Sequence, residues 1–127
     1  MDVETKLSSI HKQGVFALRG FCIGEVVLRW DTSVCISPTE TDTIQDAEKG
    51  YLHPYSSDRL ILVQPPERYV NHSCSHNTEV HNFCDVAIRD IAPGEEITSN
   101  YETDGAGHIF KCQCGSPECR GVIGGTE

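Results

Sequence analysis

Short apolar runs rich in valine, isoleucine and leucine recur along the chain, and glycine, proline, asparagine or serine residues separate them. Apolar runs of this length, bounded by turn residues, are typical of β-strands in a small domain. No long stretch has the period of an amphipathic helix, so the pattern predicts a mainly β fold. The expected strands lie at residues 14–18, 25–30, 34–36, 60–63, 78–80, 84–89 and 96–98.

Residues 37–50 fit two different local structures. Ser37 is followed three residues later by Glu40, which is the signature of a helix start with a capping box. The interior of the segment, however, is poor in apolar residues and rich in threonine. The sequence therefore favours a hairpin with strands at 41–45 and 51–53.

The length of 127 residues is that of one domain with a single core. Residues 1–13 are polar, and the first few are expected to be loose. No apolar run approaches the ~20 residues that a membrane-spanning helix needs, and the N-terminus lacks the apolar centre of a signal peptide. We therefore expect an intracellular protein with no membrane partner.

The formal net charge of −9 narrows the choice of partners. An acidic surface repels nucleic-acid phosphates, so direct binding of DNA or RNA is not expected. The same field attracts a basic peptide and speeds its encounter with the protein. Charge of this sign also keeps many proteins soluble without any further role.

Seven cysteines are a high count for this length. An odd number in a reducing compartment argues for metal ligation or isolated thiols rather than a set of disulfides. Cys22, Cys35 and Cys84 each lie alone among apolar neighbours, so we expect them to be buried small hydrophobic residues. The other four have neighbours and spacing that suggest chemistry.

Cys112, Cys114 and Cys119 supply three thiolates within eight residues. Structural zinc takes four ligands in a closed tetrahedral arrangement, with sulfur at about 2.3 Å. The fourth ligand must come from elsewhere in the chain. The spacing alone does not choose among the candidates, which are Cys74, Cys84, His108 and Cys35.

Residues 68–77 bring an amide, an imidazole and a thiol together just before an expected strand. We interpret Asn71 and His72 as facing a bound cofactor. The simpler alternative is a turn asparagine beside a core histidine. A thiol nucleophile at Cys74, two residues from His72, is a third interpretation, which zinc ligation would exclude.

These segments together resemble one family, the SET-domain protein-lysine methyltransferases that carry a post-SET zinc segment. The likeness extends over roughly residues 11–121 in the family's order. Its segments are Gly14-Val15-Phe16-Ala17, Arg68-Tyr69-Val70-Asn71-His72-Ser73-Cys74, Gly94-Glu95-Glu96-Ile97-Thr98-Ser99-Asn100-Tyr101 and the Cys112-x-Cys114-x4-Cys119 cluster.

The resemblance implies a SET fold of several short β-sheets with a knot-like C-terminal crossing and a small zinc-bound tail. It also implies which thiols hold the single zinc ion, namely Cys74, Cys112, Cys114 and Cys119. The implied segments are an N-terminal lead at 1–10, a SET domain at 11–104 with a short insert at about 31–67, a post-SET segment at 105–121 and a tail at 122–127.

The resemblance implies S-adenosylmethionine as the cofactor. Residues matching the family's cofactor site are Lys12, Gln13, Gly14, Arg68, Asn71, His72, Tyr101 and Phe110. Tyr101 matches the catalytic tyrosine, while Trp30 and Ser99 fall in the lysine channel. Lys12 replaces the first glycine of the usual Gly-x-Gly, and Ser99 stands where relatives carry phenylalanine or tyrosine.

The expected substrate is a lysine of a basic protein or peptide, such as a histone tail, and the expected compartment is the nucleus if the organism is eukaryotic. Two alternatives belong to other classes. One is a SET-like zinc module that recruits partners without catalysis, and the other is a small zinc protein with no cofactor.

Overall fold

A computed structural model of the chain describes residues 2–10, 12–100, 110–111, 119 and 122–123. Its strands are β1 (Val3–Leu7), β2 (Gln13–Ala17), β3 (Val26–Arg29), β4 (Cys35–Ile36), β5 (Leu52–Ser56), β6 (Arg59–Leu62), β7 (Asn71–His72), β8 (Thr78–Val80), β9 (Cys84–Ala87), β10 (Glu96–Ser99), β11 (Phe110–Lys111) and β12 (Val122–Ile123). Its helices are short 3₁₀ turns, η1 (Pro38–Thr43), η2 (Asp46–Tyr51) and η3 (Glu67–Tyr69). The mainly β prediction is confirmed.

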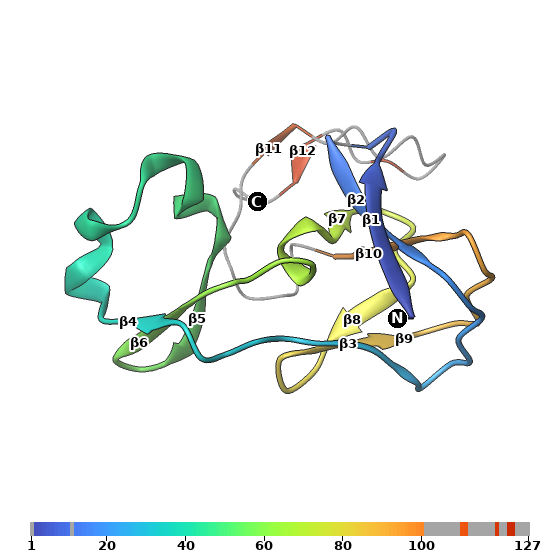
Figure 1. Cartoon of the computed structure of the whole chain (residues 1–127), viewed down its shortest axis with the longest axis horizontal. Coiled ribbons are helices and arrows are strands. Elements are labelled where there is room, and N and C mark those ends of the chain that lie inside the picture. Colours follow the sequence, from blue (N-terminus) through green and yellow to red (C-terminus); the bar gives the residue numbers. More distant parts are fainter. Residues whose placement is uncertain (1, 11, 101–109, 112–118, 120–121, 124–127) are drawn as a thin grey trace.

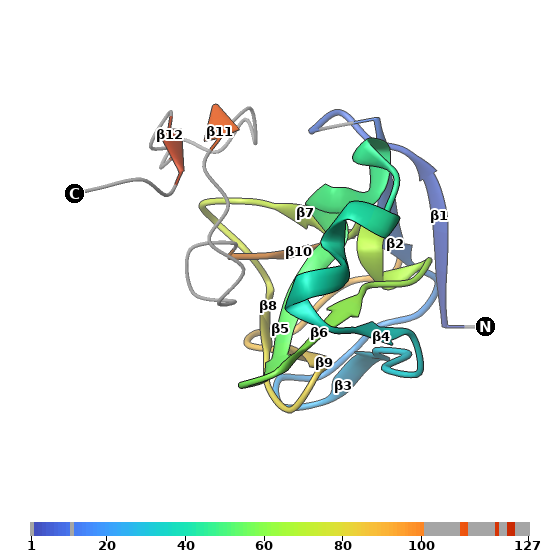
Figure 2. The same ribbon diagram turned by 90° about the vertical axis from the view of Figure 1, so that its left-hand side faces the viewer.

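The strands form several small sheets rather than one large one. A sheet in the order β1-β2-β10-β7 lies beside a sheet in the order β3-β9-β8 (Figure 1). A third sheet, β4-β6-β5, forms with η1 and η2 an arm at one end of the molecule, which Figure 2 views from that end. Among the described residues no helix has the length and apolarity needed to cross a bilayer.

The hydrophobic core lies between the first two sheets. Val15 and Ile97, which pair across β2 and β10, are fully buried. The buried apolar residues of this cluster are Val3, Val15, Ala17, Phe21, Val27, Val70, Ala87, Ile91 and Ile97. Alternating inward positions on the strands supply most of them, as expected for sheets with one face on a core.

The N-terminal lead is more ordered than its polar sequence suggests. Residues Val3–Leu7 form β1, which pairs antiparallel with β2 from Val3 opposite Ala17 to Leu7 opposite Gln13. Only Val3 of this strand is buried, and the other side chains are exposed. The prediction of a loose start was wrong from Val3 onward, because backbone pairing with β2 and the burial of Val3 hold the strand.

The hairpin expected at residues 41–53 was also wrong. The Ser37 hydroxyl accepts a hydrogen bond from the Thr39 N–H at 3.3 Å, and the Glu40 carboxylate accepts one from the Ser37 N–H at 3.0 Å. This capping box satisfies backbone donors at a helix start and begins η1. The signal at Ser37 therefore outweighed the low apolar content of the segment.

Cys22, Cys35 and Cys84 are not the buried thiols that their neighbours suggested. Cys22 is exposed, and the other two are partly exposed. Phe21 takes the core position next to Cys22, and consecutive residues in extended chain point to opposite sides. An apolar neighbour therefore says little about the burial of the thiol itself.

Lys12 has a φ of 32°, in the left-handed region that favours glycine. It lies in the turn between β1 and β2, where the Lys12 carbonyl accepts a hydrogen bond from the Ser8 N–H at 3.0 Å. The backbone at this position thus keeps a glycine-like conformation although the residue is lysine.

The substitution Lys12→Gly should stabilise the protein. A left-handed conformation costs a residue with a Cβ about 1–2 kcal/mol, which glycine would avoid. The greater freedom of glycine in the unfolded chain offsets part of this stabilisation. We expect a net gain of about 0.5–1 kcal/mol in the free energy of unfolding, measured by urea titration. Lys12→Ala, which keeps the Cβ, is the control and should show no gain. A glycine variant less stable than the wild type would contradict the strain assigned to Lys12.

Candidate functional site

The candidate site is built where β7 and β10 run side by side. Their pairing is parallel, with Thr98 opposite Asn71 and Ser99 opposite His72. The Ser73 N–H donates to the Ser99 carbonyl oxygen at 3.1 Å, which continues the ladder by one residue. All five side chains are buried. Polar residues from two motifs that are distant in sequence therefore lie side by side in the interior.

Asn71 is held against the turn between β1 and β2. Its Nδ2 donates to the Gln13 carbonyl oxygen at 2.9 Å, to Glu96 Oε2 at 3.0 Å and to Ser8 Oγ at 3.3 Å. The fold thus brings together Asn71 and Gln13, two residues that the sequence assigned to a cofactor. Their role as cofactor ligands stays a prediction, as does that of exposed Lys12 and buried Gly14.

His72 and Cys74 lie close enough to interact, with 3.5 Å between Nε2 and Sγ. Within the part of the chain that the structure describes, no three metal-ligating side chains are gathered. Two of the expected ligands, Cys112 and Cys114, lie outside the described residues, and Cys119 is partly buried. The zinc site and its ligands therefore stay predictions.

Tyr101 and the alternative ligand His108 also lie outside the described residues. Of Phe110, only the backbone is described, in β11, which pairs antiparallel with β12. The knot-like crossing of the C-terminal part stays a prediction for the same reason.

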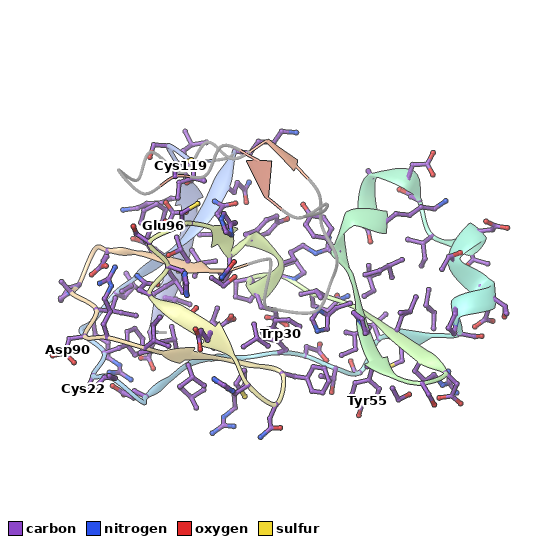
Figure 3. All side chains as sticks on the ribbon, turned by 180° about the vertical axis from the view of Figure 1, so that it is seen from behind. Cys22, Trp30, Tyr55, Asp90, Glu96 and Cys119 are labelled. Carbon is purple, nitrogen blue, oxygen red and sulfur yellow. The ribbon has the colours of Figure 1, made fainter. Side chains whose placement is uncertain are left out.

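Trp30 is the centre of an aromatic cluster that sequence reasoning missed. Its ring meets His53 edge-on at 4.9 Å between centroids and Phe83 at 6.2 Å, and Tyr55 lies 5.1 Å from Phe83. The indole N–H donates to the buried Asp85 carboxylate at 3.0 Å, which fixes the ring. Figure 3 shows Trp30 near the middle of the molecule and Tyr55 on the arm. The cluster joins three segments that are far apart in sequence, so no local sequence pattern predicts it.

Asn77 supports β10 with its side chain. Its Oδ1 accepts from the Thr98 N–H at 2.8 Å, and its Nδ2 donates to the Glu96 carbonyl oxygen at 2.8 Å. Thr78 Oγ1 donates to the Thr98 carbonyl oxygen, also at 2.8 Å. These buried side chains take the place of a neighbouring strand, so these backbone groups of β10 have hydrogen-bond partners.

Arg68, assigned to the cofactor by resemblance, contacts η2 of the arm and the residue after β6. Its Nε donates to the Val63 carbonyl oxygen at 2.8 Å, and its guanidinium stacks over the Tyr51 ring at 4.3 Å. A further ion pair with Glu48 is 3.5 Å long. These contacts explain Arg68 as an anchor of the arm, and a cofactor role stays a prediction.

Two carboxylates near the site have pKa values shifted in opposite directions. Burial raises the pKa of Glu67, whose Oε2 accepts from the Asp31 N–H at 2.6 Å. Burial also acts to raise the pKa of Glu95, but hydrogen bonds from the Ala92 N–H, Arg89 and Asn77 outweigh it and lower that pKa. At Glu67 burial outweighs the hydrogen bond from Asp31, whereas at Glu95 the hydrogen bonds outweigh burial.

These shifts predict opposite effects of pH on stability. A raised pKa means that folded Glu67 binds its proton more tightly than the unfolded chain does, so stability rises as the pH falls through the folded-state pKa. Glu67→Gln removes the buried charge and keeps an acceptor for the Asp31 N–H. We expect it to be more stable than the wild type at pH 7, with an advantage that shrinks toward pH 4.5, in urea titrations across pH.

Glu95→Gln is the matched control with the opposite sign. The lowered pKa of Glu95 contributes stability that is present at neutral pH and lost as the pH falls through the folded-state pKa. This variant should therefore be less stable than the wild type at pH 7. Equal pH profiles for the two variants would contradict the environments assigned to these carboxylates.

Comparison with known proteins gives one family match. Residues 12–102 match the model of the SET domain. This span contains Lys12 in the β1–β2 turn, all of β2, the β7 segment and all of β10.

Several similar proteins are histone-lysine methyltransferases by name. A histone-lysine N-methyltransferase, H3 lysine-36 specific, from Cryptococcus neoformans is 43% identical over an alignment of 101 positions that covers 64% of this chain and 12% of that protein. Histone-lysine N-methyltransferase ATX2 of Arabidopsis thaliana is 30% identical over 94% of this chain and 13% of its own length. Histone-lysine N-methyltransferase set9 of Schizosaccharomyces pombe is 34% identical over 73% of this chain and 22% of its own length. The chain thus spans a minor part of each relative.

Proposed function

Because the chain belongs to the SET-domain family, we propose that it is the catalytic domain of a protein-lysine methyltransferase that uses S-adenosylmethionine. The observation that carries the proposal is the hydrogen bond from Asn71 Nδ2 to the Gln13 carbonyl oxygen, which joins the β7 segment to the start of β2. The names of the relatives favour a histone or another basic protein as substrate, and the net charge of −9 favours the same class. The nucleus is the corresponding location in a eukaryote.

The residues present fit the cofactor. Its methionine part carries an ammonium and a carboxylate, which require acceptors and donors side by side. The backbone at Lys12–Gly14 and the amide of Asn71 offer both kinds of group in one place. His72 adds a buried ring on the neighbouring strand, and Phe110 would cover the adenine.

When bound, S-adenosylmethionine supplies an electrophilic methyl group on sulfur. A free lysine has a pKa of about 10.4 and must lose its proton before it attacks. Trp30, fixed by Asp85, would wall the lysine channel, exclude water and lower that pKa. The Tyr101 hydroxyl would orient the reacting groups, which is where much of the rate arises. Ser99 is small and leaves room for an amine that already carries methyl groups.

Zinc would close the channel wall. Cys74, Cys112, Cys114 and Cys119 form a set of four thiolates, which is the donor set that structural zinc prefers. Such a metal cross-link would tie the end of the chain to the β7 segment. Its role is placement, and it touches none of the reacting atoms.

Methyl transfer tests the proposed activity. The protein should transfer labelled methyl groups from S-adenosylmethionine to histones or other basic proteins, and Tyr101→Phe should reduce the rate by about 100-fold, as loss of one positioned donor does. Tyr51→Phe, which keeps the ring under Arg68, is the control and should retain activity. Absence of transfer to any basic protein would overturn the proposal, and cofactor binding without transfer would favour a recruiting module.

Metal analysis tests the zinc site. The purified protein should hold one zinc ion per chain, and Cys74→Ser should lose it as readily as Cys114→Ser, because each removes one of four ligands. Cys22→Ser changes an exposed thiol outside the set and should keep the metal. Retention of a full equivalent of zinc by Cys74→Ser would show that β7 is not joined to the C-terminal cysteines.

A further inference from the structure

The carboxylate of Glu96 lies at the centre of the contacts that hold the β1–β2 turn. Glu96 stands opposite Phe16 in the pairing of β10 with β2, and Figure 3 labels its position. Ser8 Oγ lies 2.9 Å from each of its two carboxylate oxygens. Asn71 Nδ2 donates to one of the same oxygens at 3.0 Å. One side chain therefore joins the turn, β10 and β7.

Gly14 is required for this arrangement. A Cβ at this position would collide with the Glu96 carboxylate and come within 3.0 Å of the Ser8 Cβ. The carboxylate thus lies directly over the backbone of β2. The bare backbone at Gly14, which the sequence analysis linked to a cofactor, makes room for a side chain of the protein itself.

The hydrogen bonds of Ser8 connect Glu96 to the turn. Its hydroxyl oxygen accepts from the Ile10 N–H at 3.0 Å, and its own N–H donates to the Lys12 carbonyl oxygen at 3.0 Å. Ile10 and Lys12 are therefore both tied by hydrogen bonds to Ser8, whose hydroxyl Glu96 orients. Residues beyond this turn, at Gln13 and Gly14, begin β2.

An ionised carboxylate only accepts hydrogen bonds, so both Ser8 and Asn71 must donate to it. This requirement turns the NH₂ group of Asn71 toward Glu96 and the Gln13 carbonyl oxygen, and so sets the orientation of the amide. Bonds to a charged acceptor are stronger than those between neutral groups. Removing the carboxylate would release the amide and the turn together.

We propose that Glu96 is a positioning residue for the cofactor site. It holds the Asn71 amide and the turn that leads to Gly14 in the conformation that binds the cofactor. This inference rests on the proposed function. Glu96 does not touch the reacting atoms. Its effect is to lower the loss of conformational entropy that ordering the turn and the amide would otherwise add to cofactor binding.

Calorimetry of S-adenosylmethionine binding tests the assignment. Glu96→Ala should raise the dissociation constant by about 10- to 100-fold, since two charge-assisted hydrogen bonds are lost. In Glu96→Gln the amide oxygen can take the place of Oε2 and accept from both Asn71 and Ser8, so affinity should return to within about threefold of the wild type. Glu4→Ala removes an exposed charge from the same sheet and should leave affinity unchanged.

A second measurement uses the protein without cofactor. Amide hydrogen exchange at Ile10 should be at least about tenfold faster in Glu96→Ala, because the Ser8 acceptor is no longer fixed. Gly14→Ala, which displaces the carboxylate while keeping it, should speed the same amide and weaken cofactor binding. If Glu96→Ala does not fold, Gly14→Ala provides both readouts.

The outcomes separate this inference from the proposed function. A wild type that binds no S-adenosylmethionine overturns both. A wild type that binds it while Glu96→Ala and Gly14→Ala bind equally well overturns the positioning role alone. In the transfer assay the KM for the cofactor should rise more than kcat falls in Glu96→Ala, whereas a smaller folded fraction would lower the rate without changing KM.

Discussion

The structure depends on the double pairing of β10. Buried backbone groups must find hydrogen-bond partners, and β10 lies in the interior with different partners on its edges. Residues 96–97 pair with β2, and residues 98–99 lie in register beside β7. The Asn77 amide supplies the partner of the Thr98 N–H where no strand is available. This single strand therefore fixes the relative positions of the β1–β2 turn and the β7 segment.

The pairing of β10 with both β2 and β7 also determines the geometry of the candidate site. Asn71 lies opposite Thr98, and His72 opposite Ser99, because β7 and β10 are paired in one register, and a slip by one residue would turn each polar side chain to the other face. Buried polar groups without partners are costly, so the network of Ser8, Asn71 and Glu96 also disfavours other registers. Stability and the proposed cofactor site thus rest on the same hydrogen bonds.

Sequence reasoning found what local pattern encodes. The valine- and threonine-containing run at Thr78–Val80 was placed correctly as a strand, whereas β1 was missed because its side chains are mostly exposed. At Ser37 a local capping signal was present but was given too little weight. The Glu96 network was out of reach, because Ser8 is 88 residues away in sequence and only the fold brings the two together. Motifs suggested which residues belong to the site, and the structure showed what holds them.

The most direct test is a titration of ¹⁵N-labelled protein with S-adenosylmethionine, in which the amide chemical shifts are measured at each step. The account predicts that the largest changes fall at Gln13, Gly14, Asn71 and His72, which two strands bring to one place. Changes confined to the arm, at Leu52–Leu62, or no changes at saturating cofactor, would contradict it.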